Sequence, residues 1–275
     1  MQLDFLKHIC KLPNDNLRKM LVKTLTDYQY TPIENKDFVI AEGTLPICLI
    51  AHLDTVFKRP PQDFFYDSEQ RVLWSPQGAG FDDRAGVYII LMLLKMGYRP
   101  SIIFTLGEEI GGIGAKKICE MFPKYCPFLE CKALIELDRA GQKDSVYYNC
   151  DNQSFEHYIN NFGFETDFGT FTDISFLAPE WRIAAVNLSV GYEDEHSYIE
   201  RLYCKWTDQT IAKVAQILNN AETMPHFAYV PLAFTHQQYN KLCCVCGKEV
   251  NEGYVYDLAG DQITFCKECY NTCKK

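Results

Sequence analysis

The sequence lacks the features of several large classes of protein. None of its apolar runs approaches the ~20 residues of a membrane-spanning helix, and charged residues interrupt the first segment, MQLDFLKHICKL, where a secretory signal would be apolar. Positive charge is not in excess, since 36 acidic residues against 27 lysines and arginines give a net charge of −9. Binding to nucleic acid or to an anionic membrane needs the opposite sign. We therefore expect neither partner.

Cysteine is abundant, but its distribution does not fit a disulfide framework. The chain has 13 cysteines, an odd number, and no signal for an oxidising compartment. We therefore expect reduced thiols and a cytoplasmic location. The cysteines before residue 240 are dispersed, and we interpret them as small buried apolar residues.

The remaining cysteines crowd into the last segment, residues 241–275. Cys243 and Cys246 form one C-x-x-C pair, and Cys266 and Cys269 form a second. Two such pairs with a hairpin-like apolar pattern between them are typical of a four-cysteine zinc ribbon. So short a segment has too little core to fold without its metal. We predict one structural zinc ion here, and a ribbon that packs on the rest of the chain or binds a protein partner.

The first part of the chain, residues 1–223, alternates apolar strand-like runs with helical stretches. Strands that are apolar on both faces and alternate with helices predict an α/β fold with a mixed, mostly parallel sheet sandwiched by helices. Residues 224–240, rich in proline and aromatic residues, are expected to be a linker or a packed arm. We expect strands near residues 37–41, 47–51, 71–74, 101–106, 133–137 and 183–190, and helices near 2–28 (broken at Pro13), 83–96, 111–122, 155–162, 172–177 and 208–223.

Acidic and imidazole side chains follow several of these strands. In an open α/β sheet, ligands gather outside the carboxyl ends of the strands because the loops converge there. We therefore expect these side chains to meet in space. They are His52 and Asp54 in LIAHLDTV, Asp82 in GAGFDDRAG, Glu108 and Glu109 in IIFTLGEEIGG, Asp138 in ALIELDRAG, and His196 in VGYEDEHSYIE.

The types of these residues suit a pair of divalent metal ions, zinc or another metal. Asp82, Glu109 and Asp138 offer three negative charges, and His52 and His196 can bind as neutral imidazoles. Two metal ions ~3.5–4 Å apart need a bridging carboxylate, and they lower the pKa of a bound water to roughly 7. Asp82, in a glycine-flanked turn at a helix start, is the natural bridge.

The neighbouring acids suit supporting roles. Asp54 lies two residues beyond His52 and points to the same side of the strand, so it can accept the proton of the second imidazole nitrogen. Glu108 faces away from Glu109 and can serve as the general base that carries a proton from water to the leaving amine.

These segments resemble the di-zinc exopeptidases of peptidase families M20, M28 and M42, which share one catalytic α/β fold. HLDTV, GFDDRAG, GEEIGG, ELDRAG and GYEDEHSYIE match the family motifs in order, and residues 169–200 are especially similar to tripeptidase-type members. The resemblance covers roughly residues 40–220 and implies a cis peptide between Asp82 and Asp83. The intervals 52–82 and 138–172 are too short for the inserted domains of M20 and M42 enzymes, so we expect a catalytic domain without a lid, closest in architecture to M28.

Four further residues carry weaker expectations. Thr172 and Asp173 match a substrate-side motif of those relatives, although a helix cap explains them equally well. Arg139, beside Asp138, is a third candidate for contact with substrate. Glu200, four residues after His196, is expected on a solvated helix or loop face.

The sequence as a whole predicts a two-zinc metallohydrolase that cleaves peptide or similar amide bonds of short substrates, an aminopeptidase or another exopeptidase. Two alternatives stay open. A deacylase or amidohydrolase of small N-acylated compounds would use the same fold and metal chemistry. The second alternative is a zinc-dependent binding or adaptor protein whose catalytic body is inactive.

Overall fold

A computed structural model describes residues 1–124 and 126–232, together with residues 248, 250, 253–258 and 261–266. The chain divides into two compact units, residues 1–232 and residues 233–275. Within the described residues, no helix combines the length and the apolar character that crossing a lipid bilayer requires.

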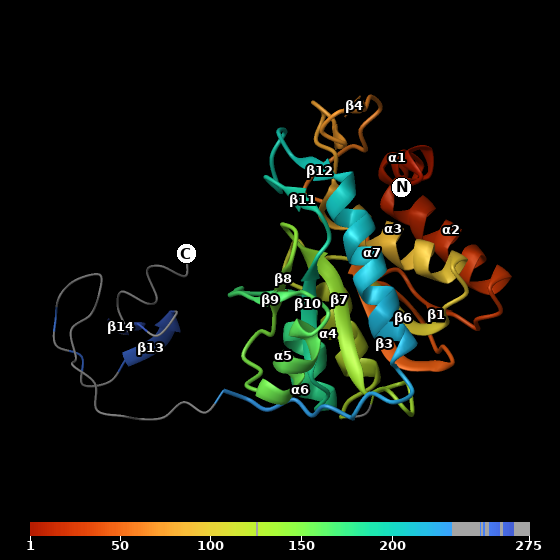
Figure 1. The fold of residues 1–275 in the computed structure, drawn as a ribbon. Helices are drawn as coiled ribbons and strands as arrows, with labels where there is room; N and C mark the ends of the chain where they lie inside the picture. The colour runs from red at the N-terminus through yellow and green to blue at the C-terminus, as the bar shows by residue number, and fades with distance from the viewer. Residues whose placement is uncertain (125, 233–247, 249, 251–252, 259–260, 267–275) are drawn as a thin grey trace. The chain divides into compact units, whose positions relative to one another are not determined.

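An eight-stranded sheet forms the centre of the first unit (Figure 1). Its middle strands β6, β3, β7 and β10 are parallel, while antiparallel strands join towards both edges. This arrangement confirms the predicted mixed, mostly parallel sheet. In spatial order the strands are β1 (Ile33–Glu34), β2 (Phe38–Ala41), β6 (Pro100–Thr105), β3 (Leu45–His52), β7 (Ala133–Arg139), β10 (Ala185–Ser189), β8 (Asp144–Val146) and β9 (Glu165–Thr166).

Both faces of the sheet are buried, because successive side chains of its strands point in opposite directions. In β3, Ile47 and Leu49 belong to one apolar core, whereas Cys48 and Ile50 belong to the other. Figure 1 shows α3 and α7 side by side against the sheet. The first core is covered by α1 (Leu3–Lys11), α2 (Asn14–Asp27), α3 (Phe81–Lys95), α5 (Gln153–Asn160) and α7 (Cys204–Asn219), and the second by α4 (Ile113–Met121) and α6 (Ile174–Trp181).

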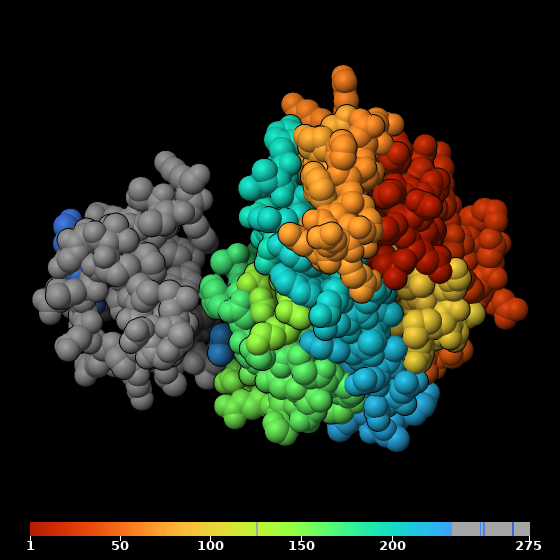
Figure 2. Space-filling view, turned by 45° about the horizontal axis from the view of Figure 1, so that its top comes forward, coloured from red at the N-terminus to blue at the C-terminus, as the bar shows by residue number. Residues whose placement is uncertain are grey.

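A smaller four-stranded sheet stands beside the main one, and the sequence predicts only its third strand. Strands this short carry too few residues for a clear alternation of apolar and polar positions. Figure 2 shows the segment of β4 and β5, in orange, between the N-terminal helices and the segment of β11 and β12. In spatial order the strands are β11 (Tyr192–Glu193), β12 (Arg201–Tyr203), β5 (Val72–Trp74) and β4 (Phe65–Asp67).

The chain after α7 runs back along the first unit as an extended arm. Backbone hydrogen bonds join Phe227 to Lys132 and to Ala184, and Leu232 to Asn149. The first unit therefore continues to Leu232.

In the second unit, β13 (Gly253–Leu258) and β14 (Asp261–Cys266) form an antiparallel hairpin. This hairpin lies in the interval between the two C-x-x-C pairs. Cys243, Cys246 and Cys269 lie outside the described residues, and the four-cysteine zinc site stays a prediction from the sequence.

Candidate metal centre

The parallel strands carry the predicted ligands to one edge of the sheet. His52 is the last residue of β3, Asp138 lies at the end of β7, and Glu109 follows β6. These three strands are neighbours in the order β6, β3, β7. His196 follows β11, in the loop that leads to β12. His52, Glu109 and Asp138 therefore lie at the carboxyl ends of the parallel strands, as their positions in the sequence predict.

The five predicted ligands form one continuous chain of contacts, with Asp82 in the middle. Oδ1 of Asp82 lies 3.0 Å from Nε2 of His52, and its Oδ2 lies 3.0 Å from Nε2 of His196. Beyond these, Asp138 Oδ1 lies 3.4 Å from His52 Nε2, and Glu109 Oε2 lies 2.9 Å from His196 Nε2. One carboxylate thus faces two separate groups of ligands, which is the arrangement that a pair of metal ions requires.

The turn that presents Asp82 is held by Glu200. Glu200 Oε2 accepts a hydrogen bond from the backbone of Gly80 at 2.6 Å, and Oε1 accepts one from the backbone of Asp82 at 2.9 Å. Gly80 has φ of +65°, a conformation that favours glycine, and the Asp82–Asp83 peptide is cis.

The expectation that Glu200 lies on a solvated face is wrong, because its side chain is fully buried against this turn. Its contact with Asp82 spans 118 positions of sequence, a separation that local patterns do not reveal. The one signal in the sequence is its place four residues after His196.

Asp54 supports the centre in two ways. Its backbone carbonyl lies 3.0 Å from Nδ1 of His52, and its carboxylate oxygen lies 3.6 Å from the same nitrogen. The carboxylate also accepts backbone hydrogen bonds from Gly107 at 2.7 Å and from Glu108 and Glu109 at 3.3 Å. Asp54 therefore holds the histidine ring mainly through its backbone carbonyl, and it holds the loop that carries both glutamates through its carboxylate.

The loop after β6 closes on itself through glycines. The carbonyl oxygen of Glu108 accepts hydrogen bonds from the backbone of Gly111 at 2.8 Å and of Gly112 at 3.1 Å. Gly111 and Gly112 have φ values of +101° and +70°, so the turn needs residues without a Cβ. It presents Glu108 and Glu109 as two half-buried carboxylates at the edge of the sheet.

Asp138 is oriented by two hydroxyl groups. Thr172 donates to its Oδ2 at 3.2 Å, and Tyr192 donates to its Oδ1 at 3.2 Å and to its backbone carbonyl at 2.9 Å. The Thr172 side chain is buried and contacts a predicted ligand directly. Arg139 points its guanidinium at Asp167, 2.7 Å away, and lines an open hollow with Glu193 and Arg201.

Asp173 and Glu136 are two further buried acids, and the sequence analysis singled out Asp173 but not Glu136. Both side chains are fully buried, and each leaves one carboxylate oxygen without a hydrogen-bond partner. Asp173 precedes α6, makes no side-chain cap, and accepts a hydrogen bond from Thr105. A glutamate inside the apolar run ALIELD was the available signal for Glu136.

The carboxyl groups disturb one another's ionisation. Burial, followed by the charge of Asp82, raises the pKa of Glu109 to about 7. Burial also raises the pKa of Glu108 to about 8, with the charges of Asp138 and Asp173 acting in the same direction. Burial raises the pKa of Asp138 to about 6 although His52 opposes the shift. When no cation is bound, the protonated form of Glu108 is therefore favoured at neutral pH, and Glu109 is close to half protonated.

The same negative charges raise the pKa of the histidines, in favour of the charged imidazolium. The hydrogen bond that His196 donates to Asp82 raises the pKa of His196 to about 9. Burial opposes the charged form of His52, but Asp138, Asp54 and Asp82 outweigh it and raise the pKa of His52 well above its usual value. Burial works against ionisation of Asp82 too, yet its hydrogen bonds from His196 and His52 hold its pKa below the usual range.

This set of donor atoms fits divalent cations. The ligand atoms of His52, Asp82 and Glu109 lie within 4.8 Å of one another, and so do those of His52, Asp83 and Asp138. Oε1 of Glu109 is buried with no hydrogen-bond partner. Asp83 differs from the others, because its two oxygens accept backbone hydrogen bonds from His52 at 3.2 Å and Gly86 at 2.9 Å. Asp83 is therefore better placed to support the backbone, and the other four side chains, with His196, stay the predicted ligands.

Comparisons with known proteins agree with this fold. No protein-family model and no curated protein matches the sequence. Among solved structures, the aminopeptidase PepT from Bacillus cereus ATCC 10987 is similar with a TM-score of 0.64 and 14% identity, over 80% of this chain and 98% of that one. A tripeptidase from Staphylococcus aureus gives 0.64 and 14%, over 81% and 98%. A TET aminopeptidase from a marine sediment Thaumarchaeota archaeon gives 0.61 and 12%, over 78% and 95%. The chain thus has the fold of these peptidases.

The ionisation of the centre predicts opposite effects of pH on the metal-free and the zinc-loaded protein. Between the ordinary carboxyl pKa near ~4.3 and the value of about 8 for Glu108, the folded state binds more protons than the unfolded chain. The free energy of unfolding without metal therefore falls as pH rises, and His196 acts in the same direction up to its pKa of about 9. Zinc needs the deprotonated ligands, so it binds better at higher pH.

We expect chelator-treated protein to melt at least ~2–4 °C lower at pH 8.5 than at pH 6, and added zinc to raise the melting temperature more at pH 8.5. Thermal unfolding followed by circular dichroism at both pH values measures this. An equal response to zinc at the two pH values would show that the carboxyl groups do not release protons when metal binds.

The Glu200 contacts predict that Glu200→Gln weakens metal binding without removing a ligand. The glutamine NH2 group would face a backbone N–H in place of an acceptor, so the turn that carries Asp82 would shift. Loss of an outer-shell partner typically lowers metal affinity by about 10- to 100-fold. Glu195→Gln, which removes the same charge from an exposed position of the same loop, should have a much smaller effect. Competition for zinc with a fluorescent chelator measures both affinities, and equal losses in the two variants would refute the positioning role.

Proposed function

We propose that this chain is a two-metal hydrolase of peptide bonds in short substrates, an aminopeptidase or a related exopeptidase. The observation that carries the proposal is the placement of Asp82, whose two oxygens each face a different histidine. His52 and Asp138 would hold one cation, Glu109 and His196 the other, and Asp82 would bridge them. When bound, such a cation pair polarises a carbonyl group and generates a nucleophile from water near neutral pH.

Glu108 would move the proton in this reaction. It is half-buried beside the centre, and the hydrogen bond from its backbone to Asp54 fixes its position. Burial raises the pKa of Glu108 when no cation is present, and a bound cation pair would lower it, so that the carboxylate form could accept a proton near neutral pH. We infer that its carboxylate takes the proton from the attacking water and delivers it to the amine that leaves.

The surface around the centre suits a peptide. The segments between His52 and Asp82 and between Asp138 and Thr172 contain only short strands and one helix, so within the described residues no lid covers the site. The ligand-bearing loops expose Ile110 at 74% and Tyr198 at 68%. Exposed apolar groups beside a polar centre provide contacts for the side chains of a substrate.

A screen of the metal-loaded full chain against peptides with free and blocked termini tests the proposed activity. We expect cleavage of di- and tripeptides with a free amino terminus and loss of that cleavage when the amine is acetylated. Preference for N-acylated amino acids would make the enzyme a deacylase, and no turnover of either class would favour an adaptor protein with an inactive body.

Glu108→Gln should retain the metals and lose most turnover. General acid–base catalysis typically contributes 10²- to 10⁴-fold, so we expect kcat to fall by about that factor. Zinc content, measured by elemental analysis, should be unchanged because Glu108 is not among the proposed ligands. Glu222→Gln, an equal change at an exposed position after α7, is the control. A Glu108→Gln enzyme with ordinary kcat would exclude this residue as the base.

We also propose three zinc ions per full chain, two in the metal centre and one in the cysteine-rich segment. Elemental analysis should give close to three, with two lost sooner to a chelator because they keep open coordination positions. Cys243→Ser should lower the content by about one, and His196→Ala should lower the retention of the labile pair only. A content of one zinc, unchanged by His196→Ala, would remove the metal centre from the proposal.

A further inference from the structure

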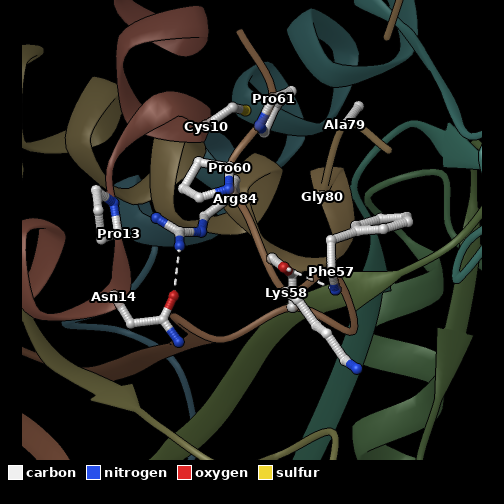
Figure 3. A pocket seen from close by; sticks show the side chains of 11 residues that line it. Cys10, Pro13, Asn14, Phe57, Lys58, Pro60, Pro61, Ala79, Gly80 and Arg84 are labelled. Carbon is white, nitrogen blue, oxygen red and sulfur yellow. Dashed lines mark hydrogen bonds between the residues drawn. The ribbon is translucent and has the colours of Figure 1, made fainter. Parts of the chain in front are cut away.

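A second pocket lies next to the metal centre, on the far side of the turn that carries Asp82. It has a volume of about 160 Å³ and opens between the start of α2, the loop after Asp54 and the turn before Asp82. Figure 3 shows Asn14, Lys58, Gly80 and Arg84 around it. No aspartate or glutamate belongs to its lining.

Arg84 contributes a buried positive charge to this pocket. Its side chain is only 3% exposed, and its guanidinium donates to the Ile9 carbonyl at 3.2 Å and to Oδ1 of Asn14 at 2.8 Å. Both acceptors are neutral, and Nε has no hydrogen-bond partner. Within the described residues, no carboxylate forms an ion pair with Arg84. The charges of Asp54 and Asp83 act on Arg84 from beyond ion-pair distance, and an anion in direct contact would stabilise the buried guanidinium further.

Two further features bring positive potential to the same pocket. Helix α2 is 14 residues long and begins at Asn14 after Pro13, with no side-chain cap. Its first backbone N–H groups and the positive end of its dipole therefore remain available to a ligand. Lys58 stands exposed on the rim, in the loop after Asp54. The nearest acid of the helix start, Asp15, is itself exposed and lies 3.8 Å from Arg18.

We propose that this pocket binds a small oxyanion between Arg84, Lys58 and the start of α2. Its volume of about 160 Å³ is several times the ~30 Å³ that a water molecule takes in the liquid, which suits an ion of sulfate or phosphate size. Arg84 would supply the fixed charge, the helix start would supply N–H donors, and the exposed Lys58 side chain, which points away from Arg84 in Figure 3, would turn towards the anion. The inference does not depend on the proposed hydrolase activity.

The position of the pocket gives the anion a structural effect on the metal centre. Thr55 lines the pocket and directly follows Asp54, and Gly80 lines it two residues before Asp82. A bound oxyanion would therefore brace the two backbone segments that carry these carboxylates. We expect it to raise the melting temperature of the protein.

Calorimetric titration of sulfate into the full chain with its metals, at constant ionic strength set with chloride, tests the proposal. We expect saturable binding of one sulfate per chain, about tenfold weaker in Lys58→Glu and undetectable in Arg84→Gln. Lys205→Glu, the same change at an exposed position of α7 away from the pocket, should bind as the native protein does. Acetate in place of sulfate distinguishes a planar carboxylate from a tetrahedral ion as the preferred form.

His196→Ala separates this pocket from the metal centre, which could itself attract sulfate. We expect this variant still to bind one sulfate per chain with saturation, with an affinity lowered only by the coupling between the metals and the anion through the shared segment. The proposal is overturned if sulfate does not saturate, if Lys58→Glu binds as tightly as the native protein, or if His196→Ala abolishes binding. If Arg84→Gln does not fold, because the α1–α2 turn loses its hydrogen bonds to the guanidinium, the sulfate affinity of Lys58→Glu decides the test alone.

Discussion

Repulsion among buried carboxylates is the constraint on which the rest of this molecule depends. The carboxylates of Asp82, Glu109 and Asp138 meet within contact distance of only two imidazoles. Negative charges gathered this closely are held together either by protons or by cations. The raised pKa of Glu109 and of Asp138 describes the first state. Two divalent cations would supply four positive charges and replace those protons. Metal binding would therefore release protons.

The proposed ligands are positioned by side chains that are not themselves proposed to bind a cation. Glu200 fixes the backbone before Asp82, Asp54 fixes the loop of Glu109, and the Thr172 and Tyr192 hydroxyls fix Asp138. Three of these four contacts join segments that are more than fifty positions apart in the sequence. The positions of the proposed ligands are therefore supported by contacts within the protein. Such supporting contacts orient metal ligands and would favour the binding of cations.

The sequence predicts the main sheet well and places the proposed ligand residues in one cluster, because both depend on local signals. A strand that is apolar on both faces, such as β3, can be recognised alone, and a polar residue at its carboxyl end then has a known location. The supporting acids could not be predicted this way. Glu200 is an ordinary exposed acid by its local pattern, and its burial depends on a distant turn that a single sequence does not display. The short strands β11 and β12 were missed because two or three residues carry no periodicity.

The segment from Gly80 to Arg84 links the two charged sites of the first unit. Asp82 enters the metal centre from one side of this segment, and Arg84 reaches into the pocket at the start of α2 on the other. Between them, Asp83 accepts the backbone N–H of His52 and ties the segment to β3. A cation pair would bind Asp82 and an oxyanion would bind Arg84, so the two proposed ligands would contact opposite sides of the same five residues. Because both hold this segment in its observed conformation, binding of either one should favour the other, and linkage requires the effect to be equal in both directions.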